Sequence, residues 1–206
     1  MAADTPPSGR LPSPRDPLGS YRVCLVCLGN ICRSPMAEVV LTDELARAGL
    51  AGQVQVDSAG TGDWHIGGPM DAGAAAELAR RGYDGSAHRA RLFDPAWFPG
   101  RDLVLAMDRR NLAQLRRMAP DAESGGARLL LFQSFDPVLA NPGLANPVLA
   151  GGALAGADPY DGEVPDPYGG AAEDYALALD LVQAAARGLA AALAAFLEVP
   201  APGPGG

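Results

Sequence analysis

The feature that most restricts the fold is the segment Cys27–Ser34, because of what stands on either side of it. An apolar run, Val23–Val26, precedes the segment, and Pro35 follows it at the start of a helical pattern. A short apolar run is typical of a buried strand, and proline suits the first turn of a helix. We therefore expect a loop that leaves a strand and enters a helix, where unpaired backbone N–H groups can bind an anion.

Two side chains of this loop indicate what happens to the anion. Cys27 is the first residue of the loop, and Arg33 stands six positions later. This spacing can place a thiol beneath a bound phosphate and a guanidinium beside it. The positive field of the loop favours the thiolate over the thiol, and the Ser34 hydroxyl can donate a further hydrogen bond to the sulfur. The combination predicts phosphoryl transfer to sulfur.

The rest of the chain alternates short apolar runs with helical patterns. We expect strands at Tyr21–Val26, Val54–Ala59, Asp102–Ala106 and Arg128–Phe132, and helices from Pro35 to Gly49 and at Asp71–Arg81, Arg109–Met118 and Ala171–Leu197. This order predicts an α/β fold with a four-stranded parallel sheet, helices on both faces, and the phosphate-binding loop after strand one. Ligands of such sheets bind beyond the carboxyl ends of the strands.

Three segments depart from that alternation. Residues 1–20 are interpreted as a disordered lead-in, 21–198 as a single domain, and 199–206 as a flexible tail. Within the domain, residues 137–163 contain the sequence Leu-Ala-Asn-Pro twice and are too broken by proline and glycine for a helix or strand. We interpret them as a low-complexity insertion, either a tolerated surface segment or a lid over the site.

The composition of the chain argues against several classes of binding partner and cofactor. The formal net charge of -8 argues against binding to nucleic acid or anionic membranes, so an anionic substrate must be attracted by a local field. No signal peptide and no apolar run near ~20 residues is recognised, and the three cysteines lie close together in the sequence. These features predict a cytoplasmic protein without membrane insertion. With two histidines and no spaced ligand set, we expect no metal and no other cofactor; the oligomeric state stays open.

The loop resembles the signature loop of the low-molecular-weight protein tyrosine phosphatases, since it reads CLGNICRS and continues as PMAE. The resemblance covers about residues 21–197 without the insertion. It implies metal-independent hydrolysis of phosphotyrosine in proteins through a cysteinyl-phosphate intermediate, with Cys27 as nucleophile and Arg33 as phosphate clamp. The other loop residues that would contact the phosphate are Leu28, Gly29, Asn30, Ile31, Cys32 and Ser34.

The family also carries a general acid in an Asp-Pro-Tyr loop shortly before its last helix. This chain has two such tripeptides, which begin at Asp158 and Asp166. In the family an aromatic residue lies nine positions after the acid; Asp166 has Tyr175 there, whereas Asp158 has Pro167. The resemblance therefore favours Asp166 as general acid and base. Because Cys27 must be ionised while Asp166 still holds its proton, we expect activity to peak on the acid side of neutral.

Two further sets of residues follow from the resemblance. Trp64 and Tyr168 would flank the aromatic ring of the substrate, although core packing is the alternative for Trp64. Asn30, Ser58 and His88 would support the loop from below through hydrogen bonds.

Parts of this pattern also occur in other classes of protein. Arsenate reductases of this fold need further cysteines downstream, and none follows Cys32. Protein-arginine phosphatases commonly have threonine at the position of Ile31, and they stay open as an alternative, as does a phosphotyrosine-binding module without turnover. The spacing of Cys24 and Cys27 is that of a redox pair, but Cys24 lies inside the strand. The resemblance also suggests a reversible disulfide between Cys27 and Cys32.

Overall fold

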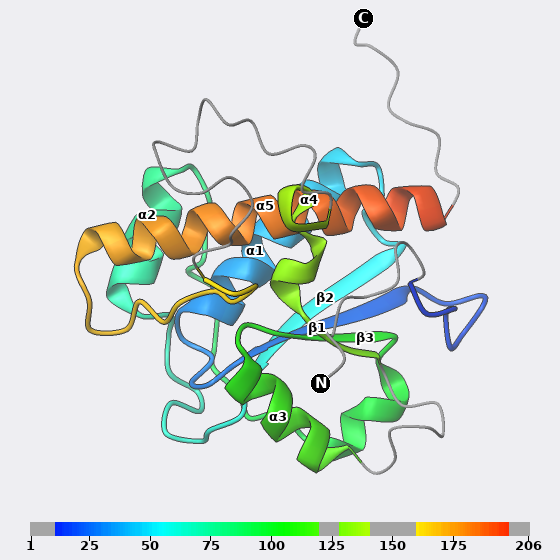
Figure 1. Ribbon diagram of the computed structural model, residues 1–206, viewed down its shortest axis with the longest axis horizontal. Helices are drawn as coiled ribbons and strands as arrows, with labels where there is room; N and C mark the ends of the chain where they lie inside the picture. Colours follow the sequence, from blue (N-terminus) through cyan, green and yellow to red (C-terminus); the bar gives the residue numbers. More distant parts are fainter. Residues whose placement is uncertain (1–10, 120–127, 141–159, 198–206) are drawn as a thin grey trace, which may run out of the picture.

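A computed structural model describes residues 11–119, 128–140 and 160–197 (Figure 1). Its sheet has four parallel strands in the order β2-β1-β3-β4. The strands are β1 (Tyr21–Cys27), β2 (Val54–Gly60), β3 (Leu103–Ala106) and β4 (Arg128–Leu131). The helices are α1 (Arg33–Arg47), α2 (Ala72–Arg80), α3 (Arg109–Met118), α4 (Pro137–Ala140) and α5 (Ala172–Phe196), with short 3₁₀ helices η1 (Pro95–Gly100) and η2 (Phe132–Phe135).

Helices cover both faces of the sheet, as the alternation predicts. Figure 1 shows α1 and α5 on one side and α3 on the other. The protein has two hydrophobic clusters, and the central strand β1 contributes side chains to both. Val23 and Leu25 belong to one cluster, and Cys24 and Val26 belong to the other. A strand buried on both faces reads as a continuous apolar run. The loop after β1 therefore starts from a strand that is paired on both edges and packed on both faces.

Helix α5 is apolar because it is part of the core. By length and composition alone this helix could cross a membrane. In the fold, however, its contact with α1 and η2 buries a full stripe of side chains. These are Tyr175, Ala178, Leu179, Val182, Ala185, Ala186, Leu189, Ala190 and Leu193. The small residues on α5 permit close packing: a Cβ added at Gly188 would lie 1.8 Å from the carbonyl oxygen of Phe135.

All eight predicted strands and helices are present, with ends that differ by at most two residues. The expectation that residues 137–163 contain no helix is wrong at their start, where α4 forms one short turn. The sequence explains this turn: Pro137 is its first residue, and the Asp136 carboxylate accepts a hydrogen bond of 2.8 Å from the Val138 N–H.

The expected flanking segments are only partly within the described residues. Residues 1–10, 141–159 and 198–206 lie outside them, so most of the insertion, including Asp158, does too. Residues 11–20 run beside the domain, where the backbone N–H of Arg15 donates to Asp102 at 2.7 Å. The start of the domain at residue 21 stays a prediction.

Candidate active site

The loop after β1 surrounds the sulfur of Cys27. The sulfur is nearly buried and accepts hydrogen bonds from the Asn30 backbone N–H (3.2 Å) and the Ser34 hydroxyl (3.0 Å). Within the described ranges, the backbone N–H groups of residues 28, 29 and 31–33 donate to no protein acceptor. Because α1 begins at Arg33, the positive end of its dipole adds to these free donors. The loop thus offers an anion site directly above a thiol.

Asn30 gives the loop its shape. It adopts a left-handed conformation, with φ of 53°, that asparagine tolerates better than most residues. Its buried amide nitrogen donates to the hydroxyls of Ser34 (2.9 Å) and Ser58 (2.8 Å), and its amide oxygen accepts from the Arg91 N–H (2.9 Å). Every polar atom of this side chain therefore has a partner, which fixes the backbone turn around the sulfur.

The support continues outward through Ser58 and His88. Ser58 donates to the carboxylate of Glu38 at 2.6 Å, so its oxygen is free to accept from Asn30. The Nε2 atom of His88 lies 2.7 Å from the backbone oxygen of Asn30, which requires that this nitrogen carry a proton. At the end of β2, a Cβ added at Gly60 would lie 2.7 Å from the oxygen of Leu28, so only glycine lets the loop lie this close.

Removing the Asn30 side chain should destabilise both the loop and the protein. In Asn30→Ala, we expect a loss of about 2–4 kcal/mol in the free energy of unfolding, because buried groups lose their partners and alanine is strained at positive φ. Urea unfolding measures this loss. Asn30→Gly keeps the conformational freedom and isolates the hydrogen-bond part, so a glycine variant as stable as the wild type would contradict the role given to these bonds.

His88 should make stability depend on pH. Burial lowers the pKa of His88, although its contact with the Asn30 oxygen opposes the shift. The folded protein then binds the proton less readily than the unfolded chain, so the free energy of unfolding falls as the pH drops below about 6.5. We expect this fall to be shallower in His88→Gln when unfolding is followed from pH 7.5 to 5. Equal slopes for the two proteins would contradict the prediction.

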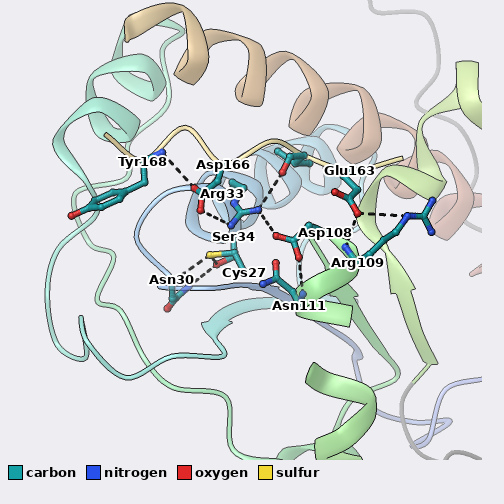
Figure 2. Close-up of polar contacts among 11 residues, drawn as sticks. Cys27, Asn30, Arg33, Ser34, Asp108, Arg109, Asn111, Glu163, Asp166 and Tyr168 are labelled. Atoms are coloured by element: carbon teal, nitrogen blue, oxygen red, sulfur yellow. Dashed lines mark hydrogen bonds and ion pairs between the residues drawn. The ribbon is translucent and has the colours of Figure 1, made fainter. Parts of the chain in front are cut away.

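Arg33 connects the loop to two other elements (Figure 2). Its side chain is only 3% exposed and contacts Asp108 at 2.7 Å and Asp166 at 2.8 Å, and it donates to the backbone oxygen of Val164 at 3.2 Å. Its Nε atom is buried without a protein partner. Burial alone would lower the pKa of this guanidinium, but the charges of Cys27, Asp166 and Asp108 raise it. Arg33 is therefore a fixed cation whose Nε–H donor is still available.

Asp108 is a site residue that the sequence left without a role. It is the N-cap of α3, where one carboxylate oxygen accepts from the Asn111 N–H at 2.6 Å while the other binds Arg33. One signal was available: an aspartate directly before a helix, just past the carboxyl end of a parallel strand, points to the same edge as the loop. Asp108 thus holds Arg33 in one orientation.

The segment that carries Asp166 is tied to α3 and β3. The Val164 N–H donates to the oxygen of Met107 at 2.8 Å. Arg109 contacts Asp161 at 3.0 Å through its guanidinium, and its backbone N–H donates to Glu163 at 2.9 Å. These contacts place Asp166 against Arg33, with 43% of its side chain still exposed. Asp158, the other candidate acid, lies outside the described residues.

The expected aromatic partner of the acid loop also lies near the site. Tyr175 packs so closely on the first turn of α2 that a Cβ at Gly73 would lie 2.5 Å from its ring. Burial, followed by the neighbouring Asp71 carboxylate, raises the pKa of the Tyr175 hydroxyl to about 12. Asp71 in turn donates its N–H to the oxygen of Ile31 at 2.9 Å. Through this chain of contacts, the start of α5 is joined to the loop.

Exposed apolar side chains line one side of the site. Trp64 is 70% exposed and Tyr168 60%, so the core alternative for Trp64 is excluded. Ile66 and Leu28 are exposed as well. Between them, the ring of His65 lies against Gly29, where a Cβ would come within 3.0 Å of it, and 6.2 Å from the ring of Tyr168. We call Trp64 and Tyr168 the aromatic rim.

The three cysteines form no disulfide, and the surroundings of two of them favour the protonated thiol over the thiolate. Burial, followed by the nearby Asp57, raises the pKa of Cys24. Burial, followed by the carboxylates of Asp71 and Asp166, raises the pKa of Cys32. Neither environment favours a thiolate. The Asn30 N–H and the Ser34 hydroxyl both donate to the sulfur of Cys27.

Comparison with known proteins identifies the family. The family model of the low molecular weight phosphotyrosine protein phosphatases matches residues 22–154. The chain belongs to this family. A low molecular weight protein-tyrosine-phosphatase of Streptomyces coelicolor is 44% identical over 179 residues, which cover 87% of this chain and 97% of that protein. An alignment of that coverage includes Asp166, although the family model ends before it.

Solved structures of low molecular weight phosphatases have the same fold. The chain is similar to a protein tyrosine phosphatase from Entamoeba histolytica, crystallised with Hepes in its active site, with a TM-score of 0.70, 26% identity, and coverage of 86% of this chain and 99% of that one. It is also similar to YfkJ from Bacillus subtilis, with a TM-score of 0.66, 30% identity, and coverage of 87% and 96%. The fold of this chain is therefore shared with both proteins.

Proposed function

We propose that this phosphatase hydrolyses phosphotyrosine in proteins, with Cys27 as nucleophile, Arg33 as phosphate clamp and Asp166 as general acid and base. The observation that carries the proposal is the meeting of all three at one point: Arg33 ends the loop around the Cys27 sulfur, and its guanidinium contacts Asp166 at 2.8 Å. A nucleophile, an anion clamp and a proton donor within one site are the parts that phosphoryl transfer requires.

In the first step, the free N–H groups of the loop and Arg33 bind the oxygens of the phosphate. The arriving dianion takes the place of the Asp166 carboxylate at Arg33. The Cys27 thiolate forms a bond to phosphorus as the bond from phosphorus to the tyrosine oxygen breaks. Asp166 donates its proton to that oxygen, so the leaving group departs as a neutral phenol.

In the second step, Asp166 acts in the opposite direction. Now a carboxylate, it accepts a proton from a water molecule that attacks the phosphocysteine, and the sulfur leaves as a thiolate. The Ser34 hydroxyl, 3.0 Å from the sulfur, stabilises that thiolate. Ser34 has a single proton and also lies 3.2 Å from the oxygen of Ala59, so it donates to the sulfur when the sulfur is charged.

Phosphotyrosine fits the surroundings of the loop better than phosphoserine. The sulfur is buried beneath the loop, so only a long side chain can bring its phosphate to it while the peptide stays outside. The aromatic rim and Leu28 supply flat apolar surface for the ring. Phosphoarginine is also long, but its guanidinium gains less from apolar walls than a phenyl ring does.

The test is steady-state hydrolysis of matched peptides that carry phosphotyrosine, phosphoserine or phosphoarginine, from pH 4.5 to 8, with chelator and reductant present. We expect turnover of phosphotyrosine with a bell-shaped profile that peaks below pH 7, because Cys27 and Asp166 are needed in opposite states. A higher kcat/KM for phosphoarginine would assign the alternative substrate class. Binding of phosphotyrosine without turnover would make this chain a binding module.

We also infer that the protein works in the cytoplasm, free of nucleic acid and not inserted in a membrane. A catalytic thiol needs a reducing compartment, the cysteines are unpaired, and the net charge is -8. Fractionation of cells that produce the protein tests the location.

A further inference from the structure

A cation without a partner among the described residues lies next to the site, on the side away from Tyr168 (Figure 2). Arg110, the second residue of α3, is exposed, and its guanidinium forms no ion pair or hydrogen bond with any residue in the described ranges. The two other arginines nearby differ in this respect, since Arg33 pairs with Asp108 and Asp166, and Arg109 pairs with Asp161. In a chain of net charge -8, a free arginine at this place can attract an anion.

Arg110 lines a surface hollow that continues from the phosphate site. The hollow has a volume of about 330 Å³, and Leu28, Gln114 and Pro165 also line it. Arg33 and Asp166 belong to its wall as well as to the proposed catalytic site. Figure 2 shows α3 and Tyr168 on opposite sides of these two residues. Because the hollow shares Arg33 and Asp166 with the phosphate site, a residue close to a bound phosphotyrosine would lie near it.

The other charges of the hollow are already paired. Asp108 and Asp166 contact Arg33, and Glu163 accepts from the backbone N–H of Arg109. The amide nitrogen of Gln114 is also engaged, since it donates to the oxygen of Thr61 at 3.1 Å. Among the described residues, Arg110 is thus the charged group of this wall without a partner, and Leu28 and Pro165 offer apolar surface in the same wall.

We propose that this hollow is a second substrate subsite, which takes an acidic side chain close to the phosphotyrosine in the peptide. Arg110 binds the carboxylate, while the methylene groups of the side chain lie on Leu28 and Pro165. The proposal rests on the function proposed above and adds sequence preference to it. Since a solvent-exposed ion pair changes an equilibrium constant roughly two- to fivefold, we expect the preference in binding and in kcat/KM.

The experiment compares three proteins on three peptides. The peptides carry phosphotyrosine between pairs of glutamate, glutamine or lysine residues. The proteins are the wild type, Arg110→Glu, and Arg117→Glu as matched control. Arg117 is exposed on the same helix, about 10 Å farther along its axis, which exceeds the Debye length of about 8 Å at physiological ionic strength. The readout is the ratio of kcat/KM for the glutamate peptide to that for the lysine peptide.

The wild type should prefer the glutamate peptide, Arg110→Glu should change the ratio by about tenfold or more toward lysine, and Arg117→Glu should keep the wild-type ratio. The preference should weaken in 0.5 M salt. An unchanged ratio in Arg110→Glu would overturn the subsite, and so would an equal shift in both variants, because that would indicate a general field effect.

A binding measurement separates this proposal from the proposed activity. Dissociation constants for the same peptides are measured by fluorescence anisotropy with Cys27→Ser as background, with and without Arg110→Glu. Hydrolysis of no peptide, together with a dissociation-constant ratio that reverses in Arg110→Glu, would contradict the phosphatase and support the subsite. Hydrolysis of all three peptides at equal kcat/KM, with equal dissociation constants, would contradict the subsite alone.

Discussion

Cys27→Ser should lower kcat on aryl phosphates and phosphotyrosine peptides by roughly 10⁴-fold or more, because a neutral hydroxyl cannot replace the thiolate as nucleophile. The exchange alters one atom, and a serine oxygen can accept the same hydrogen bonds from Asn30 and Ser34. We therefore expect phosphopeptide binding to persist while turnover is lost. Steady-state kinetics and anisotropy on the same preparation measure both.

Cys32→Ser is the matched control for this prediction. Cys32 is a buried thiol of the same loop, and its environment does not favour the thiolate. We expect this variant to retain kcat within about tenfold of the wild type, which is well short of losing a nucleophile. If Cys32→Ser were as inactive as Cys27→Ser, or if Cys27→Ser kept substantial turnover, the assignment of the nucleophile would be wrong.

Asp166→Asn should slow the reaction by about 10²–10³-fold on phosphotyrosine peptides, since general acid catalysis commonly contributes effects of this size. The loss should be smaller on an aryl phosphate with an acidic phenol, because such a leaving group departs without a proton. The pH profile of the variant should also lose its fall above the optimum. Measuring kcat/KM over a series of aryl phosphates tests both expectations.

Two other aspartates of the same region serve as comparisons. Asp161→Asn removes a carboxylate that is 85% exposed and pairs with Arg109, five residues before Asp166. Asp158→Asn removes the competing candidate, which belongs to the other Asp-Pro-Tyr tripeptide. We expect both variants to keep the wild-type dependence on the leaving group. A dependence that changed in Asp158→Asn and not in Asp166→Asn would move the role of general acid to Asp158.

The sequence predicted the fold well because its signals are local. Strands β1, β3 and β4 are mostly short apolar runs, and helix α3 begins after a capping aspartate and shows a clear apolar stripe. The short helix α4 was missed because four residues are too few to show a period, and only its cap at Asp136 marked it. The 3₁₀ helices η1 and η2 were not predicted either, because six and four residues are also too few to show a period.

The site was predictable where one contiguous motif supplies it. The residues from Cys27 to Ser34 are contiguous, so the local sequence is enough to predict the loop. The contacts of Arg33 with Asp108 and Asp166, in contrast, join residues 75 and 133 positions apart. Such pairs depend on how strands assemble into a sheet, which no local pattern encodes. The free charge of Arg110 is likewise a property of the assembled surface.

The most direct test of the proposed mechanism is to trap its covalent intermediate. Asp166→Asn is mixed with a fast aryl phosphate, quenched in acid within milliseconds, and mapped by peptide mass spectrometry. We predict one phosphoryl group on the sulfur of Cys27, formed together with a burst of phenol and absent from Cys27→Ser. Continued turnover without any phosphorylated Cys27, or with the phosphoryl group on another residue, would contradict a cysteinyl-phosphate mechanism.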